Sequence, residues 1–129
     1  LAFLKGLKRL MTNGGIALLT TLTADGFDIQ TLWQHSKAVH PPHHINLLSV
    51  AGYRRLIERA GLACVEIATP GKLDVDIVGN TLKENPEIEV TPFIRRLVTE
   101  SDPETREAFQ AFLADHLLSS HIRILVSID

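Results

Sequence analysis

The sequence predicts an α/β fold, and three observations carry that prediction. Two segments, at residues 1–22 and 49–68, each join an amphipathic helix, a glycine stop and an apolar strand. A third strand is expected at residues 121–128, where isoleucine and valine alternate with polar residues. Helices that alternate with strands in this way pack on a shared sheet.

The composition is that of a single globular domain. The chain has 129 residues, of which 45% are hydrophobic and 22% charged, and a net charge of -2. This content suffices for a buried core, and the charge balance argues against a nucleic-acid or anionic-membrane surface. The single cysteine, Cys64, excludes an internal disulfide and fits a cytoplasmic location. No apolar run reaches the roughly 20 residues that cross a bilayer.

The first helix–strand unit is defined by its apolar spacing. Residues 1–12 are predicted to form a helix because five apolar residues share one stripe: Phe3, Leu4, Leu7, Leu10 and Met11. Asn13-Gly14-Gly15 supplies the backbone turn that ends it. Ile16–Leu22 is a continuous apolar run, which predicts a strand buried on both faces.

Residues 23–48 are predicted to form a long irregular loop. Asp25-Gly26 is a turn signal, and the segment His40-Pro41-Pro42-His43 cannot lie inside a helix. Loops of this length within a compact domain are usually functional or disordered. This one carries the only tryptophan and four of the six histidines, which favours an ordered, functional loop.

The second half predicts one further unit and a helical insertion before the last strand. Ser49 is the expected N-cap of a helix that ends at Ala60, and residues 62–68 form the next strand. Three short helices follow, beginning near Asp74 or Asp76, at Thr91-Pro92 and at Asp102-Pro103. Asp74 and Asp76 are interpreted as helix caps, because they lie at a helix start, and not as an acid–base pair or cation site.

Three segments together follow the sequence pattern of one enzyme family. Residues 10–21 read Leu-Met-Thr-Asn-Gly-Gly-Ile-Ala-Leu-Leu-Thr-Thr, which resembles the fifth-strand region of that family, the class I S-adenosylmethionine-dependent methyltransferases, with Asn13 in place of the common proline. Residues 44–62 are similar to its histidine loop and the helix after it, which ends in Ala-Gly-Phe in the family and in Ala-Gly-Leu here. Residues 69–78 resemble a bacterial subgroup of methyltransferase-domain proteins.

The resemblance implies that residues 1–129 form the carboxyl-terminal part of a partial Rossmann-like methyltransferase domain. The expected sheet is mixed and three-stranded, with family order 5-7-6 and the last strand antiparallel between the other two. The amino-terminal half that holds S-adenosylmethionine is expected to be absent, since no Gly-x-Gly-x-Gly follows a first strand. Gly14-Gly15 also precedes a strand, whereas a glycine-rich turn that binds a cofactor follows a strand and leads into a helix. The parent protein is expected to be an enzyme, and the isolated chain to bind no cofactor and be inactive.

The resemblance also suggests the site residues. His44 is the first candidate catalytic residue and His43 the second, because the family's loop histidine can orient or deprotonate an acceptor. Phe27 and Trp33 could stack on a substrate, and Thr21 lies at the carboxyl end of a strand, where open sheets bind ligands. The expected acceptor is a small molecule and not a nucleic acid.

Two alternatives stay open. The chain could be a non-enzymatic module derived from the methyltransferase fold, because strand 16–22 would be an exposed apolar edge that invites a homodimer. A zinc ion on the histidine-bearing loop is the weaker alternative, since the spacing of its four histidines fits no standard site: His35, His40, His43 and His44. No metal is therefore expected.

Overall fold

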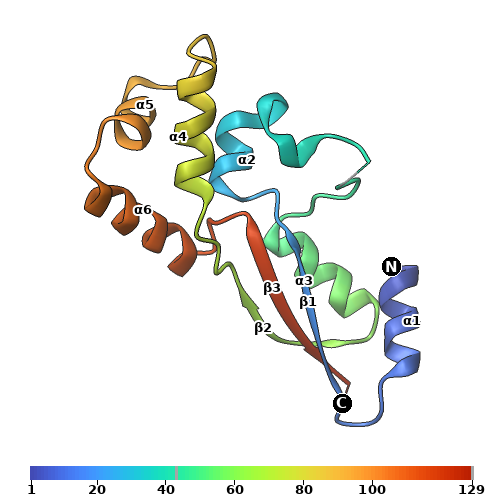
Figure 1. The fold of residues 1–129 in the computed structure, drawn as a ribbon. Helices are drawn as coiled ribbons and strands as arrows, with labels where there is room; N and C mark the ends of the chain where they lie inside the picture. The colour runs from blue at the N-terminus through green and yellow to red at the C-terminus, as the bar shows by residue number, and fades with distance from the viewer. Residues whose placement is uncertain (43, 129) are drawn as a thin grey trace.

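The computed structural model describes residues 1–42 and 44–128 and shows a three-stranded sheet with helices on one face and at one end (Figure 1). In chain order, the strands and α-helices are α1 (Ala2–Leu10), β1 (Ile16–Leu22), α2 (Phe27–Leu32), α3 (Val50–Arg59), β2 (Ala63–Ala68), α4 (Asp74–Glu84), α5 (Pro92–Thr99), α6 (Pro103–Asp115) and β3 (His121–Ser127). Two short 3-10 helices, η1 (Trp33–His35) and η2 (Lys37–Val39), lie between α2 and α3.

The last strand, β3, lies between the other two strands and runs antiparallel to both, which is the position that the resemblance implies for it. In the numbering of this chain, the strand order is β1-β3-β2. The expected order 5-7-6 uses the family's strand numbers, which this sheet of three strands does not share. The expectation of a mixed sheet is wrong, because β1 and β2 run in the same direction but do not pair with each other. A register shift between Cys64 and Glu66 interrupts the β2–β3 ladder.

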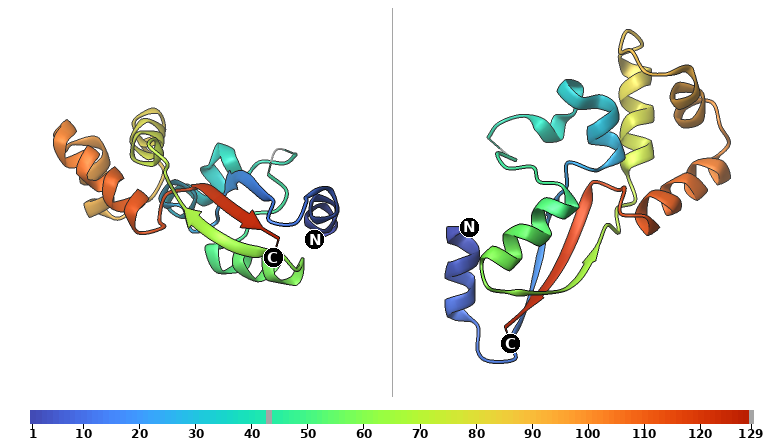
Figure 2. Two further views of the ribbon diagram at one scale, coloured as in Figure 1. Left: turned by 90° about the horizontal axis from the view of Figure 1, so that it is seen from below. Right: turned by 180° about the vertical axis from the view of Figure 1, so that it is seen from behind.

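One face of the sheet is covered by α1 and α3 (Figures 1 and 2). The main core lies between these helices and the sheet, and its buried members are Leu4, Ile57, Ala60, Leu62, Ile122, Ile124 and Val126. The prediction that β1 is buried on both faces is wrong, since Ile16 is 68% exposed and Leu18 is 59% exposed. The physical reason is that no described element covers the second face of the sheet. An apolar run like that of β1 is typical of a strand with both faces covered, and here only one face is.

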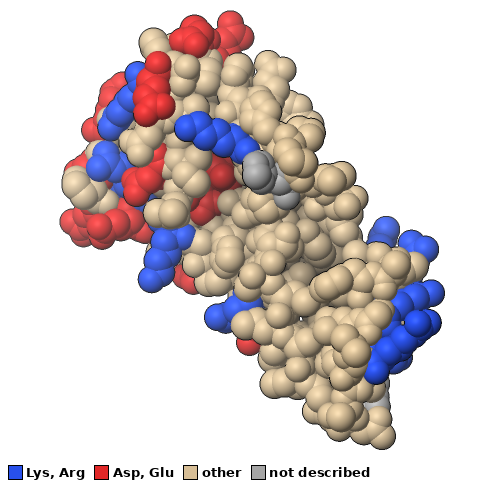
Figure 3. Space-filling model, turned by 45° about the vertical axis from the view of Figure 1, so that its right-hand side comes forward, with Lys and Arg blue, Asp and Glu red and all other residues tan. Residues whose placement is uncertain are grey.

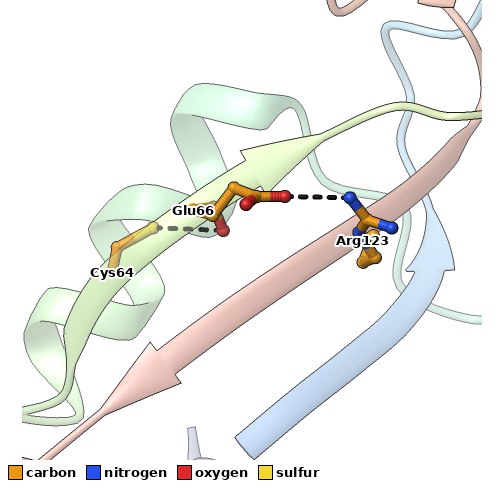
Figure 4. A network of polar contacts seen from close by, with 3 residues as sticks. All are labelled: Cys64, Glu66 and Arg123. Carbon is orange, nitrogen blue, oxygen red and sulfur yellow. Dashed lines mark hydrogen bonds and ion pairs between the residues drawn. The ribbon is translucent and has the colours of Figure 1, made fainter. Parts of the chain in front are cut away.

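The same open face carries the exposed ion pair of the sheet. Arg123 Nη2 on β3 lies 3.0 Å from Glu66 Oε1 on β2 (Figure 4). The neighbouring Cys64 is a free, half-buried thiol whose Sγ lies 4.0 Å from the carbonyl oxygen of Glu66. Both charged side chains are about half exposed, so the pair adds little to stability.

A second hydrophobic core joins α2 to the helical insertion of α4, α5 and α6, which the sequence predicted before the last strand. Its buried members are Leu32, Val75, Val78, Leu82, Ile88, Val98 and Leu113. The prediction of an irregular segment at 23–48 is wrong in part, because α2, η1 and η2 occupy most of residues 27–39. Ile29 and Leu32 of α2 are fully buried, and this packing stabilises a helix too short to show a clear periodicity.

Charge is distributed unevenly between the two ends of the molecule. Lysine and arginine gather over the end that carries α1, and aspartate and glutamate, with several basic residues among them, gather over the end that carries α4 to α6 (Figure 3). An area with few charges lies between them. None of the described helices combines the length and the apolar character that a membrane span requires.

Candidate functional site

Six of the seven buried polar residues of the described chain lie in the loops and the first helical turns at one edge of the sheet, between the two hydrophobic cores. They are Thr23, Asp28, Thr69, Asp74, Ser119 and Ser120, and we call them the polar junction. This edge is formed by the carboxyl ends of β1 and β2 and by the amino end of β3. It is the edge at which open α/β sheets bind ligands.

Hydrogen bonds across the junction tie three loops together. The Thr23 amide donates to the carbonyl of Ser120 at 2.8 Å, which joins the loop after β1 to the loop before β3. The Thr69 hydroxyl donates to the carbonyl of Ala114 at 3.2 Å, which joins the loop after β2 to α6. The loops are thus held by specific polar contacts and not by apolar packing alone.

Asp74 is the centre of this network. Its Oδ2 accepts from the Ser119 hydroxyl at 2.5 Å and from Gln110 Nε2 at 2.9 Å, and its Oδ1 accepts from the Ser120 amide at 2.7 Å. Burial by itself would raise the pKa of Asp74, but these hydrogen bonds to the ionised carboxylate outweigh burial, so the pKa is lowered.

The prediction that Asp74 caps its helix is therefore wrong. Leu73 occupies the N-cap position of α4, without a side-chain cap, and Asp74 is the first helical residue. Its carboxylate is turned toward the Ser119–Ser120 loop, 45 residues further along the chain, and a long-range partner of this kind leaves no local signature. Asp76, the other predicted cap, is exposed within the first turn of α4.

Asp28, on α2, is the second buried carboxyl of the junction, and its pKa is shifted in the opposite direction from that of Asp74. It is only 3% exposed, and among the described residues its Oδ1 has no hydrogen-bond partner. Burial raises the pKa of Asp28 from 3.8 to about 6, the Ser120 side chain works against this rise, and the charge of Asp74 adds to it. The two neighbouring carboxyls are thus held with pKa values on opposite sides of the ordinary one, an arrangement found at sites that bind ligands or transfer protons.

We expect Asp28→Asn to stabilise the fold at neutral pH. The folded pKa of about 6 lies above the unfolded value of 3.8, so the wild-type chain loses stability as pH rises from about 4 to about 6. The amide removes that penalty, which predicts a gain of about 1–3 kcal/mol at pH 7 and little change below pH 4. Urea unfolding of both proteins between pH 3.5 and 7.5 measures this, and a gain that is independent of pH would contradict the assignment.

Two cavities flank the junction. The larger, of about 770 Å³, lies between the loop after β2 and α6, and its polar lining includes Thr69, Lys72, Arg106 and Gln110. The smaller, of about 370 Å³, lies between α2, η2 and α4 and is lined in part by Asp28. Both volumes fall in the range of small-molecule pockets.

The predicted substrate-contacting residues occupy different positions around this edge. The Phe27 ring packs edge-on against Phe109, with centroids 5.1 Å apart, which anchors α2 to the second core. Trp33 is 61% exposed at the start of η1 and has a left-handed φ of 43°. Thr21 pairs with Ile122 in the sheet, two residues before the junction. None of the three lines either cavity, and their contact with substrate stays a prediction.

Of the predicted catalytic histidines, His44 is half-buried in the segment before α3. His43 lies outside the described residues. Within 1–42 and 44–128, no three His, Cys, Asp or Glu side chains are grouped closely enough to hold a metal ion. The zinc alternative also involves His43, so it stays a prediction without support from the described part of the loop.

Sequence reasoning missed Asp28 altogether. The available signal was an acidic residue between Phe27 and Ile29, inside a short apolar stretch that ends at Leu32. An acid in such a stretch is rarely buried without a reason. Ser119 and Ser120 were considered only in relation to His121, whereas the structure pairs them with Asp74.

No protein-family model matches the chain, and no curated protein matches it either. The methyltransferase expectation therefore depends on the sequence motifs alone.

Proposed function

We propose that this chain is the substrate-side half of an S-adenosylmethionine-dependent methyltransferase domain that acts on a small molecule. The supporting observation is the sheet edge at which the polar junction and two cavities meet. The position of β3, antiparallel between β1 and β2, is also what the resemblance implies. Under this proposal the loops after β1 and β2 shape the acceptor pocket, and the protein's contribution is to orient the acceptor.

The residues of this chain do not fit the methyl-donating cofactor itself. In the Gly14-Gly15 turn, the Gly15 amide donates to the carbonyl of Thr12 at 2.8 Å, and the Gly15 carbonyl accepts from Ile128. A Cβ at Gly15 would lie 2.7 Å from the Thr12 carbonyl oxygen, so the turn is filled by its own backbone. We therefore derive no transfer step from this chain, and the cofactor is assigned to the part of the domain that covers β1.

The open surfaces of the sheet support a missing covering layer. β1 is an edge strand whose outer side pairs with no described strand, apart from an isolated bridge between Thr23 and Leu48. Its exposed Ile16 and Leu18 continue onto the uncovered face of the sheet. Apolar edges and faces of this kind are normally covered in a stable protein.

Calorimetric titration with S-adenosylhomocysteine tests the proposal. The complete natural gene product that contains these residues is expected to bind it and to transfer a labelled methyl group to a small-molecule fraction. The 129-residue chain serves as the matched control and is expected not to bind. A complete gene product that fails to bind would refute the methyltransferase proposal, and binding by the 129 residues alone would refute the assignment of the cofactor to another part.

A non-enzymatic dimerisation module is the second candidate, and the exposed edge of β1 favours it. In this case two copies pair through β1, and Leu18→Lys is expected to convert the dimer to a monomer, because a charge on an edge strand opposes pairing. Sedimentation velocity at high concentration measures the change.

The control for that experiment is Val65→Lys, which places the same charge on the opposite edge strand at a side chain that is 57% exposed. It should leave a β1-mediated dimer intact. A wild-type chain that remains monomeric would rule out the module, and a dimer lost equally in both variants would assign the interface to the open face of the sheet instead of the β1 edge.

A further inference from the structure

The smaller cavity has a polar rim and an acidic inner wall. Lys37, Asn80 and Glu84 are exposed around it, whereas Asp28, Leu32 and Ser36 are buried against it. Its volume of about 370 Å³ is sufficient for a small organic molecule and much larger than a single water.

Asp28 lines this cavity and carries an unused acceptor. Its Oδ1 has no partner in the described chain, although the side chain is 97% removed from solvent. The nearby Asp74 carboxylate, in contrast, has accepted three hydrogen bonds. Burying an unpaired carboxylate oxygen is costly, so a native protein that retains one has a use for it or a partner for it.

We propose that this cavity is a binding site for a small organic amine, whose ammonium group donates a hydrogen bond to Asp28. Leu32, Ala38 and Ile77 supply apolar wall for the carbon part of the ligand. A positively charged donor is favoured over an anion, because Asp28 and Glu84 line the cavity with a single lysine and the charge of Asp74 acts on Asp28. Charge-assisted hydrogen bonds of this type are stronger than neutral ones.

A metal ion is a poorer occupant than an amine. The described residues contain no group of three candidate ligands, and their one buried side-chain acceptor without a partner is a single carboxylate oxygen. Cations such as Ca²⁺ take six or more oxygen ligands, and Mg²⁺ requires a near-octahedral set. This inference concerns ligand binding and does not depend on the proposed methyl transfer.

Lys37 is the competitor within the chain, because it lines the same cavity and carries its own ammonium group. If the Lys37 side chain turned into the cavity and bound the Asp28 carboxylate, it would compete with an added amine for the same acceptor. The groups that determine the pH dependence are therefore Asp28 on α2, Lys37 on η2, and Asp74 and Glu84 on α4. Amine binding should strengthen as pH rises through about 6, since the ionised form of Asp28 binds an ammonium group and the protonated form does not.

Titration of the isotope-labelled chain with n-butylammonium, followed by NMR at pH 7.5, tests the proposal. Saturable shifts are expected in the amides around Asp28 and Asn80, with binding at least about tenfold weaker for Asp28→Asn. Butyrate and n-butanol, which match the probe in size but not in charge, should bind much more weakly. The control variant Asp76→Asn removes an exposed carboxylate from the same helix and should leave binding unchanged.

A second measurement needs no variant. Saturating n-butylammonium should lower the pKa of Asp28 in the wild-type chain, followed by its carboxyl ¹³C resonance. The proposal is overturned if the probe gives no saturable shifts, if butyrate binds as well as the amine, or if Asp28→Asn binds like the wild type. It is also overturned if amine binding appears only in Lys37→Gln, since Lys37 would then be the natural partner of Asp28.

Discussion

Asp74→Ala is expected to lower the free energy of unfolding by about 3–5 kcal/mol. The substitution leaves the Ser119 hydroxyl and the Ser120 amide, which belong to buried residues, without their acceptor, whereas Gln110 Nε2 keeps the Gly71 carbonyl. Each buried polar group that loses its partner costs about 1–3 kcal/mol. The loss should also loosen the connection between the two hydrophobic cores, because the network joins α4 to the loop before β3.

Urea unfolding at pH 7 measures this effect. The matched control is Asp76→Ala, which removes an exposed carboxylate two residues away on the same helix and should change stability by less than about 0.5 kcal/mol. Because the pKa of Asp74 is lowered in the folded chain, its stabilising contribution is present above pH 3.8 and is lost as pH falls below that value. An Asp74→Ala variant as stable as Asp76→Ala would show that the network does not hold the junction together.

Gly26→Ala is expected to cost about 3 kcal/mol, the second largest effect. Gly26 precedes α2, and a Cβ there would overlap the Cα and Cβ atoms of Ser120 and lie 2.7 Å from the Ser120 amide nitrogen. The obstacle is backbone and not the end of a flexible side chain, so relief requires the loop after β1 to move away from β3. The φ of −63° at Gly26 is ordinary, so the cost comes from contact alone.

Gly6→Ala is the control for that substitution. Gly6 lies within α1, and a Cβ there meets no atom within 4 Å, so alanine should stabilise the helix by about 0.5–1 kcal/mol. Thermal unfolding of the two variants gives the comparison. Gly26→Ala with wild-type stability would mean that the close approach of the loop to Ser120 is not maintained in solution.

The elements with strong local signals were predictable from the sequence. Ile16–Leu22 is a strand with the predicted bounds, and Ser49 caps its helix as expected. The helices predicted to begin at Thr91-Pro92 and Asp102-Pro103 do so, with Thr91 and Asp102 as their caps. In each case the capping side chain and the amide it accepts from lie three residues apart. Local chemistry of this kind is visible in a single sequence.

The polar junction was not predictable from the sequence, because its hydrogen bonds join residues that are far apart in the chain. Asp74 obtains its partners from residues 36 to 46 positions away, and nothing near it in the sequence distinguishes it from a cap. The exposure of Ile16 and Leu18 was also hidden, because an apolar strand does not reveal whether a covering layer lies in the same chain. Both features depend on contacts, or on missing contacts, between distant segments.

The central claim is that the edge of the sheet holds two buried carboxyls whose pKa values are shifted in opposite directions. Asp74 is hydrogen-bonded, and Asp28 has an oxygen without a partner among the described residues. A carboxyl ¹³C NMR titration of the 129-residue chain tests it most directly. The structure predicts a pKa of about 6 for Asp28 and a pKa below 3.8 for Asp74. An Asp28 carboxyl that titrates at or below 3.8 would contradict the claim, since it would then be paired or solvated like an ordinary surface acid.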